Sequence, residues 1–433
     1  MLQAALKAAD PALALRRTLS LKGHRLLAAD HAYDLRRIRR VVVVGAGKAA
    51  VPMARTVAGV LRRRLDSAFV VAPSGAAGGV ESKIEVAHAG HPVPDRRGLK
   101  AAERTLKIAS SLGSDDLLLV LLSGGASSLL PLPDEGLQLT DKQRTTKLLL
   151  RSGATIAEVN AVRKHLSAIK GGRLAAATRA QVLTLLLSDV RGDDLGVIGS
   201  GPTAPDRTTF LDAVRIVRRY GLWDKLPPSV RVHLVEGLAG WRPETPKQRS
   251  PIFRRVHHVV IGNNRLACEA AAKAARLAGY EAVLVEEYVT GEAERLGRWM
   301  GELGKNLAGR KTLPGPVCVV AGGELTVTVR GSGRGGRAQE FALAAALAIQ
   351  RVPGVWVMGI GTDGRDGPTD AAGAIVDGQT VARGKHKRLN AATYLKKNDS
   401  YRFFAKAGGH IKTGPTGTNV NDLYVLLVHP QWK

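Results

Sequence analysis

The 433-residue chain has only two cysteines, Cys268 and Cys318, which can build no disulfide framework and match no metal-binding spacing. Aromatic residues make up 4% of the chain, so any core must rest on Leu, Val, Ile and Ala. No apolar run approaches the ~18 residues of a membrane-spanning helix. The N-terminal segment 1–17 lacks the uninterrupted apolar stretch of a secretory signal and is expected to form a first amphipathic helix rather than a transit peptide. These absences predict a cytoplasmic protein that does not enter a membrane.

Acidic residues are scarce as well: 37 Asp and Glu stand against 64 Lys and Arg, which gives a net charge of +27. Such a field favours anionic partners, whether phosphorylated metabolites, nucleic acid or acidic lipid. The arginine clusters at 36–40 and 62–64 have no aromatic platform beside them, and no zinc-finger or RNA-recognition pattern is present. A solvated basic surface is therefore favoured over a specific nucleic-acid site.

Short apolar runs alternate with helical patterns along the whole chain, which is typical of βαβ units and an α/β fold. A proline-rich stretch at 226–251 is expected to be a linker. A basic amphipathic helix is expected at 157–177, interrupted near its end by Gly171 and Gly172. Strands are expected at 41–44, 68–72, 117–122, 182–187, 256–261, 282–285, 317–321, 325–330, 355–360 and 423–428. The chain is therefore expected to form two α/β domains, residues 1–235 and 236–433.

A glycine-containing turn follows the strand 41–44. Gly45 and Gly47 precede Lys48 at a helix start, where backbone N–H groups can approach an anion. The spacing is not that of a P-loop, and the third glycine of a dinucleotide-binding motif is missing. Two interpretations of this turn remain: an anion-binding site in which Lys48 supplies the positive charge, or a tight turn without a ligand.

A second turn, after the strand 117–122, combines Ser123, Gly124, Gly125 and Ser127 at a helix start. Hydroxyl groups and glycines in this position can hold a phosphate or a carboxylate. A serine there can equally cap the helix, so the pattern leaves both roles open.

The strand 182–187 leads to Asp189. Open α/β sheets bind ligands at the carboxyl ends of their strands, and a carboxylate there can bind Mg²⁺ or act as a base. Asp193 is a second candidate magnesium ligand, although Asp193 and Asp194 can equally cap the next turn.

Arg337 follows a Gly/Arg-rich loop, 331–336, and begins an alanine-rich helix. Its planar guanidinium can bind phosphate or carboxylate through two parallel hydrogen bonds. A loop that runs straight into a helix favours this role over a flexible hairpin tip.

The sequence is similar to the glycerate kinases of the MOFRL type, a group also labelled hydroxypyruvate reductase. The resemblance covers nearly the whole chain and rests on motifs in one order. They are GAGKA (45–49), HPVPD (91–95), SGGAS (123–127), NAVRKHLS (160–167), KGGRL (170–174), SDV (188–190), GSGPT (199–203), GNN (262–264), GGRAQE (335–340), GTDG (361–364) and TGPTGTN (413–419).

The resemblance implies ATP- and Mg²⁺-dependent phosphorylation of D-glycerate, usually to 2-phospho-D-glycerate. It implies a Rossmann-like first domain with a mainly parallel sheet, a MOFRL-type α/β second domain, and an active site in the cleft between them. The family's catalytic lysine, acid and arginine fall on Lys48, Asp189 and Arg337, and Ala338 stands where the family commonly has Asn. The expected cofactor-binding residues are Gly45, Gly47, Ser123, Gly124, Gly125, Ser127 and Asn263, and Asp189 and Asp193 are the expected Mg²⁺ ligands.

Two other functions remain as alternatives. One is NAD(P)H-dependent reduction of hydroxypyruvate, which the incomplete dinucleotide motif disfavours. The other is nucleic-acid binding, which rests on charge alone. The sequence favours a kinase acting on a small molecule as a monomer or homodimer. It leaves open which hydroxyl is phosphorylated and which turn holds ATP.

Overall fold

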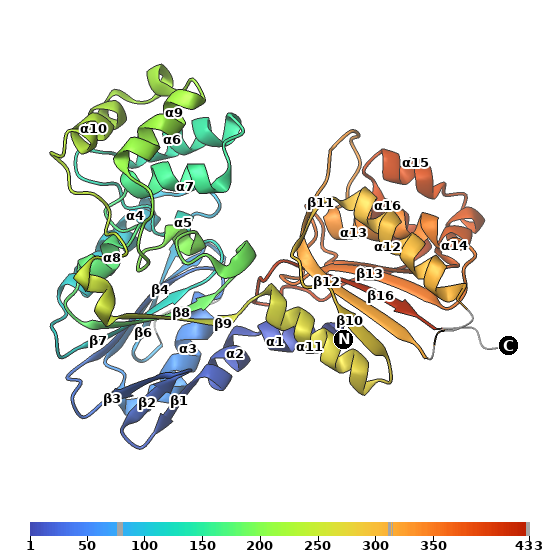
Figure 1. Cartoon of the computed structure of the whole chain (residues 1–433), viewed down its shortest axis with the longest axis horizontal. Coiled ribbons are helices and arrows are strands. Elements are labelled where there is room, and N and C mark those ends of the chain that lie inside the picture. Colours follow the sequence, from blue (N-terminus) through green and yellow to red (C-terminus); the bar gives the residue numbers. More distant parts are fainter. Residues whose placement is uncertain (76–80, 311–312, 314, 430–433) are drawn as a thin grey trace. The chain divides into compact units, whose positions relative to one another are not determined.

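The computed structural model describes residues 1–75, 81–310, 313 and 315–429 (Figure 1). Contacts divide the chain into two compact units. We call residues 14–261 the central unit and residues 1–13 with 262–433 the split unit. Two units were expected, with a division after residue 235, whereas the contacts group 236–261 with the preceding residues and 1–13 with the last part of the chain. Within the described residues, no helix combines the length and apolarity needed to cross a bilayer.

The main sheet of the central unit has the strand order β6-β5-β4-β7-β8-β9. β4 pairs in parallel with β5 and β7, and β7 pairs in parallel with β8, so the carboxyl ends of these strands lie at one edge. Every residue of β4 and β7 is buried, which explains their unbroken Val and Leu runs. The strands are β4 (Val41–Ala46), β5 (Ser67–Pro73), β6 (Ile84–Ala89), β7 (Leu117–Leu122), β8 (Gln181–Leu187) and β9 (Val256–Gly262). The mainly parallel sheet predicted for this part of the chain is confirmed.

Helices complete the central unit in two clusters. Val42 and Val44 of β4 share a core with Ala101 and Ala102 of α4. A second core joins the helices α6, α7, α9 and α10 around Phe210. The helices are α2 (Pro11–Thr18), α3 (Ala50–Leu61), α4 (Arg96–Ser110), α5 (Ala126–Leu129), α6 (Leu139–Arg151), α7 (Ile156–His165), α8 (Arg173–Ala176), α9 (Phe210–Arg219) and α10 (Pro228–Leu238). Further elements are the antiparallel strands β1 (Leu19–Lys22), β2 (Arg25–Ala28) and β3 (His31–Asp34), and the 3₁₀ turns η1 (Arg62–Arg64), η2 (Arg191–Asp193), η3 (Ile198–Ser200), η4 (Trp223–Lys225) and η5 (Pro251–Arg255).

Two expectations for the central unit are wrong. The helix expected at 157–177 ends at His165, well before the interruption expected at Gly171 and Gly172, and only α8 follows. The two glycines do adopt φ angles of 57° and 83°, which no α-helix contains. The stretch 226–251 is not a linker. It contains α10, whose Val230 and Leu234 are fully buried in the unit.

The sheet of the split unit is mixed. Its strand order is β10-β12-β16-β13-β14-β15, with β11 also paired to β12. β16 runs antiparallel to both β12 and β13. The strands are β10 (Glu281–Leu284), β11 (Val289–Glu292), β12 (Val317–Thr326), β13 (Val355–Gly361), β14 (Gly373–Asp377), β15 (His410–Ile411) and β16 (Asp422–Val428). The two strands expected at 317–321 and 325–330 are replaced by one strand that ends at Thr326, because Gly322 and Gly323 stay in register opposite Leu423 and Asp422.

Helices cover both faces of this sheet (Figure 1). On one face, Phe341 of α13 packs on Tyr424 of β16 with ring centroids 4.6 Å apart. On the other, α11 lies so close to β12 that a Cβ on Gly322 would fall 2.4 Å from the sulfur of Cys268. The helices are α1 (Leu2–Ala9), α11 (Asn264–Leu277), α12 (Ala293–Ala308), α13 (Arg337–Ala348), α14 (Thr380–His386), α15 (Ala391–Lys396) and α16 (Ser400–Ala407).

Candidate active site

The turn between β4 and α3 is held by contacts within the protein. Gly47 has a φ of 138°, and a Cβ there would lie 2.1 Å from Ser123 Oγ. The backbone N–H groups of residues 47–49 donate to Val71 O (3.1 Å), Gly124 O (2.9 Å) and Ser123 Oγ (3.0 Å) in that order. A Cβ on Gly45 would lie 2.7 Å from Leu121 O. These glycines therefore serve the close approach of β4 to β7, which favours the tight-turn interpretation over an anion held by N–H groups.

The side chain of Lys48 remains the chemical feature of this turn, and it is exposed. Burial lowers the pKa of His91, and the nearby Lys48 lowers it further. A Cβ on Gly125 would lie 2.9 Å from the imidazole of His91. Lys48, His91 and Gly125 thus meet at the carboxyl ends of β4 and β7. Because the lowered pKa favours the neutral form of His91, Lys48 is the positively charged member of this group.

Ser127 belongs to a buried polar cluster. Its Oγ lies 2.8 Å from Ser200 Oγ, and Ser200 Oγ donates to Asn160 Oδ1 at 3.1 Å. The ammonium group of Lys170 donates to Ser127 O at 2.8 Å and to Ser127 Oγ at 3.0 Å. Burial, with Arg163 and Lys142 nearby, holds the pKa of Lys170 well below its usual value. Ser127 is therefore positioned by Lys170, a residue outside the cofactor-binding set expected from the sequence.

Asp189 lies two residues past the end of β8, as expected, and is partly buried. The turn after it is organised by Ser188, whose Oγ accepts a hydrogen bond of 3.2 Å from the N–H of Val190. Asp193 sits in the same loop with a φ of 53°. Strand spacing is about 4.8 Å, and β7 separates β4 from β8. The strands that lead to Lys48 and Asp189 are therefore roughly 10 Å apart in the sheet.

In the split unit, Arg337 binds two carboxylates of the protein itself. Its Nε and Nη2 donate to the two oxygens of Asp422 at 2.6 and 3.1 Å, and its Nη1 donates to Glu324 at 2.6 Å. Burial raises the pKa of Asp422 to about 6, against the opposing effects of Arg337 and of a hydrogen bond from Tyr424. Burial disfavours the charged form of Arg337, but the two carboxylates raise its pKa, so the pair is ionised at neutral pH. The side chain is thus a rigidly positioned cation.

The Gly/Arg-rich loop before Arg337 is explained by packing. A Cβ on Gly331 or on Gly333 would lie 2.4 Å from Lys397 O. The N–H groups of Ala338 and Gln339 donate to the carboxylate of Asp366 at 3.0 and 2.8 Å. The helix start that could have received an external anion is therefore already occupied by a side chain of the protein.

Asn263 caps α11, because its Oδ1 accepts a hydrogen bond of 2.9 Å from the N–H of Leu266. Its neighbour Asn264 donates to Val420 O at 2.8 Å and to Asp422 O at 2.9 Å. This places the start of α11 beside the Arg337–Asp422 pair within the split unit. A cap has a structural role of its own, and cofactor binding by Asn263 stays a prediction.

The candidate residues fall into two groups, one in each unit. Lys48, Ser127 and Asp189 lie at the strand ends of the central unit, and Arg337 and Asn263 lie at the polar end of the split unit. Sequence reasoning missed Lys170, Glu324 and Asp422, which hydrogen-bond Ser127 or Arg337, and His91, which lies near Lys48. His91 and Lys170 stand in recognisable motifs, which was the available signal. Asp422 is the first residue of β16 and lies in none of these motifs, so no sequence signal identified it.

Parallel strands with polar turns at their carboxyl ends define the class of α/β enzymes that bind ligands there. Residues 1–235 match the model of a domain of unknown function, DUF4147, and residues 317–422 match the MOFRL family. The chain belongs to the glycerate kinase family of the MOFRL type, as the sequence motifs predicted.

The relatives support this assignment over nearly the full length. The chain is 41% identical over 427 residues to the glycerate 2-kinase of Pyrococcus horikoshii, which covers 98% of the chain and 95% of the relative. It is 43% identical over 394 residues to a protein of Agrobacterium vitis with the provisional name of hydroxypyruvate reductase, at 90% and 87% coverage. The crystal structure of glycerate kinase from Thermotoga maritima superposes with a TM-score of 0.88 at 40% identity, covering 99% and 97% of the two chains.

Proposed function

We propose that the protein transfers the γ-phosphoryl group of ATP to D-glycerate and forms 2-phospho-D-glycerate. The observation that carries this proposal is a lysine and a carboxylate, Lys48 and Asp189, at the ends of nearby parallel strands. The chain in which they lie is 41% identical to a glycerate 2-kinase.

Phosphoryl transfer requires the protein mainly to position the two substrates and to stabilise the charge on the transferred group. In the proposed step, a glycerate hydroxyl oxygen forms a bond to the γ-phosphorus, and the bond from that phosphorus to the β,γ-bridging oxygen breaks. The hydroxyl proton passes to the carboxylate of Asp189. Lys48 stabilises the charge that develops on the transferred group.

Arg337 is proposed to hold an anionic group of a substrate. A guanidinium has five N–H donors, and the bonds to Asp422 and Glu324 use three of them. Two donors therefore remain on a side chain whose direction is fixed by its carboxylate partners. This arrangement lets Arg337 bind an anion without first losing conformational freedom.

Mg²⁺ fits the proposed chemistry, since it neutralises phosphate charge when bound. Kinases hold this ion through one or two carboxylates together with substrate phosphates. Among the described residues, no group of three or more His, Cys, Asp or Glu side chains could hold a metal by itself. Asp189 and Asp193, on one short loop, match the smaller requirement. We expect the protein to bind ATP and Mg²⁺ in the cytoplasm. We expect it to be a monomer or a homodimer.

The decisive experiment is to incubate the protein with ATP, Mg²⁺ and D-glycerate and to assign the product by phosphorus NMR. We expect 2-phospho-D-glycerate and ADP in equal amounts. Formation of 3-phospho-D-glycerate would overturn the regiochemistry, and the absence of any phosphoglycerate would overturn the kinase assignment. A parallel sample with hydroxypyruvate and NADH tests the reductase alternative, for which we expect no decrease in absorbance.

A further inference from the structure

The central unit contains a cavity of about 790 Å³ that the proposed roles of Lys48 and Asp189 leave unused. It is lined by α6, by the segment 92–94, and by residues in and after α5 and α7. Its lining has six cationic side chains and no aspartate or glutamate. The cations are Lys142, Arg144, Lys147, Arg151, Arg163 and Lys170. A cavity with this lining attracts a ligand that carries several negative charges.

Three of these side chains are buried or partly buried and form no hydrogen bond or ion pair with a carboxylate of the described residues. Lys170, 1% exposed, donates to Ser127 and to Gly199 O, and Lys142, 7% exposed, donates to Leu132 O at 2.9 Å. No residue in the described part of the chain forms a hydrogen bond or ion pair with the partly buried guanidinium of Arg163. Burial lowers the pKa of all three groups. Asp134 opposes part of this effect at Lys142, whereas no carboxylate in the described part of the chain opposes it at Arg163 or Lys170. Clustered like charges are unfavourable in a protein interior unless an anion compensates them.

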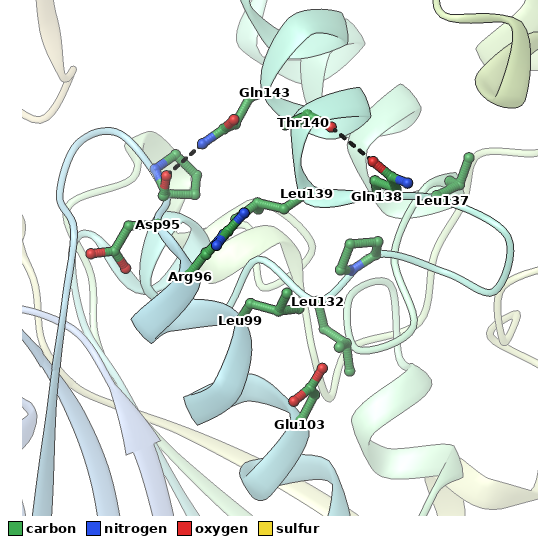
Figure 2. A pocket seen from close by; sticks show the side chains of 12 residues that line it. Asp95, Arg96, Leu99, Glu103, Leu132, Leu137, Gln138, Leu139, Thr140 and Gln143 are labelled. Carbon is green, nitrogen blue, oxygen red and sulfur yellow. Dashed lines mark hydrogen bonds between the residues drawn. The ribbon is translucent and has the colours of Figure 1, made fainter.

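A neighbouring cavity of about 640 Å³ provides a contrast within the same unit (Figure 2). It is lined by Asp95 and Glu103, with Arg96 as its one cation among the described lining residues. Gln143 lines both cavities and donates to Pro94 O at 2.8 Å (Figure 2). Carboxylates repel a polyanion, so the basic cavity is the better of the two for such a ligand.

The basic cavity also has an apolar part. Val93 and Leu150 are 66% and 60% exposed, and Pro92 and Pro131 line the same space. An aromatic base needs apolar surface of this kind, and the volume lies within the range of small-molecule sites. Pro92 lies at one end of the cavity and directly follows His91 in the sequence. In space, His91 lies close enough to Lys48 for the lysine to lower the pKa of its imidazole. A ligand in this cavity would therefore reach the strand ends that carry the proposed chemistry.

We propose that this cavity binds the nucleoside triphosphate, with its phosphates on Arg163, Lys147 and the Lys170–Ser127 pair and its base against Val93 and Leu150. The proposal rests on the proposed function, and it assigns ATP rather than glycerate to this place. The charge decides between the two substrates, because a triphosphate carries about four negative charges and glycerate carries one. Six cations without a carboxylate match the former.

The test measures binding without turnover. Wild type, Arg163→Gln and the matched control Arg215→Gln are titrated by calorimetry with Mg²⁺ and a β,γ-imido ATP analogue. Arg215 lies exposed on α9 in the same unit, so the control removes one charge outside the cavity. Loss of a hydrogen bond to a charged group should raise the Kd of Arg163→Gln at least about tenfold and leave the control unchanged. Lys147→Gln, on the exposed wall of α6, should weaken binding in the same direction.

Arg163→Gln should melt no lower than wild type, because no described hydrogen bond to the side chain is lost. Unchanged analogue affinity in both cavity variants would overturn the proposal, as would a raised KM for D-glycerate with an unchanged Kd for the analogue. Binding of the analogue that depends on Arg163 in a protein without glycerate kinase activity would support this site and remove the proposed function. Kinase activity together with analogue binding that depends on neither Arg163 nor Lys147 would remove this site and leave the proposed function standing.

Discussion

Asp189 is the residue whose charge the proposed reaction most depends on. The hydroxyl of its neighbour Ser188 accepts a hydrogen bond from the N–H of Val190 and shapes the following turn. Asparagine has nearly the shape of aspartate and removes only its charge, so Asp189→Asn should keep the fold. Help from a general base is worth about 10²–10⁴ in rate, so kcat should fall at least about a hundredfold.

A magnesium titration of the same variant separates two roles for Asp189. If the side chain holds the metal, a higher Mg²⁺ concentration should restore part of the lost activity. If it accepts the hydroxyl proton, added Mg²⁺ should have no effect. An unchanged kcat in Asp189→Asn would remove this residue from the reaction.

Arg337 has a structural role beside its proposed catalytic one. Its partner Asp422 has a side chain only 3% exposed, and removing one member of such a pair leaves a buried charge uncompensated. Arg337→Ala should therefore lower the free energy of unfolding by about 3 kcal/mol. Thermal and urea melts measure the effect. Arg330→Ala, at an exposed position of the same unit, is the control and should melt like wild type. A wild-type melting temperature for Arg337→Ala would show that the Asp422 pair contributes little.

At the scale of elements, the strands of the central sheet could be predicted because both of their faces are buried. A strand in that position must be apolar at every residue. The runs at 41–44 and 117–122 consist only of Val and Leu. The order of these strands places Lys48 and Asp189 at one edge, which is why reading the residues after each strand located them.

Other elements depended on partners that lie far away in the sequence. The glycines of the loop 331–336 suggested a ligand site, but Gly331 and Gly333 make room for the backbone of Lys397. Asp422 lies 85 residues from Arg337, and no local pattern connects the two. The prolines of 226–251 suggested a linker, whereas Pro228 occupies the first turn of α10, where proline stabilises a helix.

At the scale of the whole molecule, the net charge of +27 predicts adsorption to polyanions such as heparin or DNA. The contacts are between exposed charges, which salt screens with a Debye length of about 10 Å at 0.1 M and about 3 Å at 1 M. Retention on a heparin column should therefore disappear between these concentrations, without sequence preference in gel-shift competition. Sequence-selective binding that persists near 1 M salt would require a specific nucleic-acid site.

The split unit has a consequence for synthesis of the chain. Residues 1–13 pack with residues 262–433, and α1 buries Ala5 and Ala9 fully while Thr418 donates a hydrogen bond of 2.5 Å to Ala9 O. The ribosome releases these first residues before the central unit and completes their partners after it. At 5–20 residues per second, residues 14–261 take roughly 12–50 s to make. For that interval the apolar face of α1 has none of its partners from residues 262–433, because that part of the chain has not yet been synthesised.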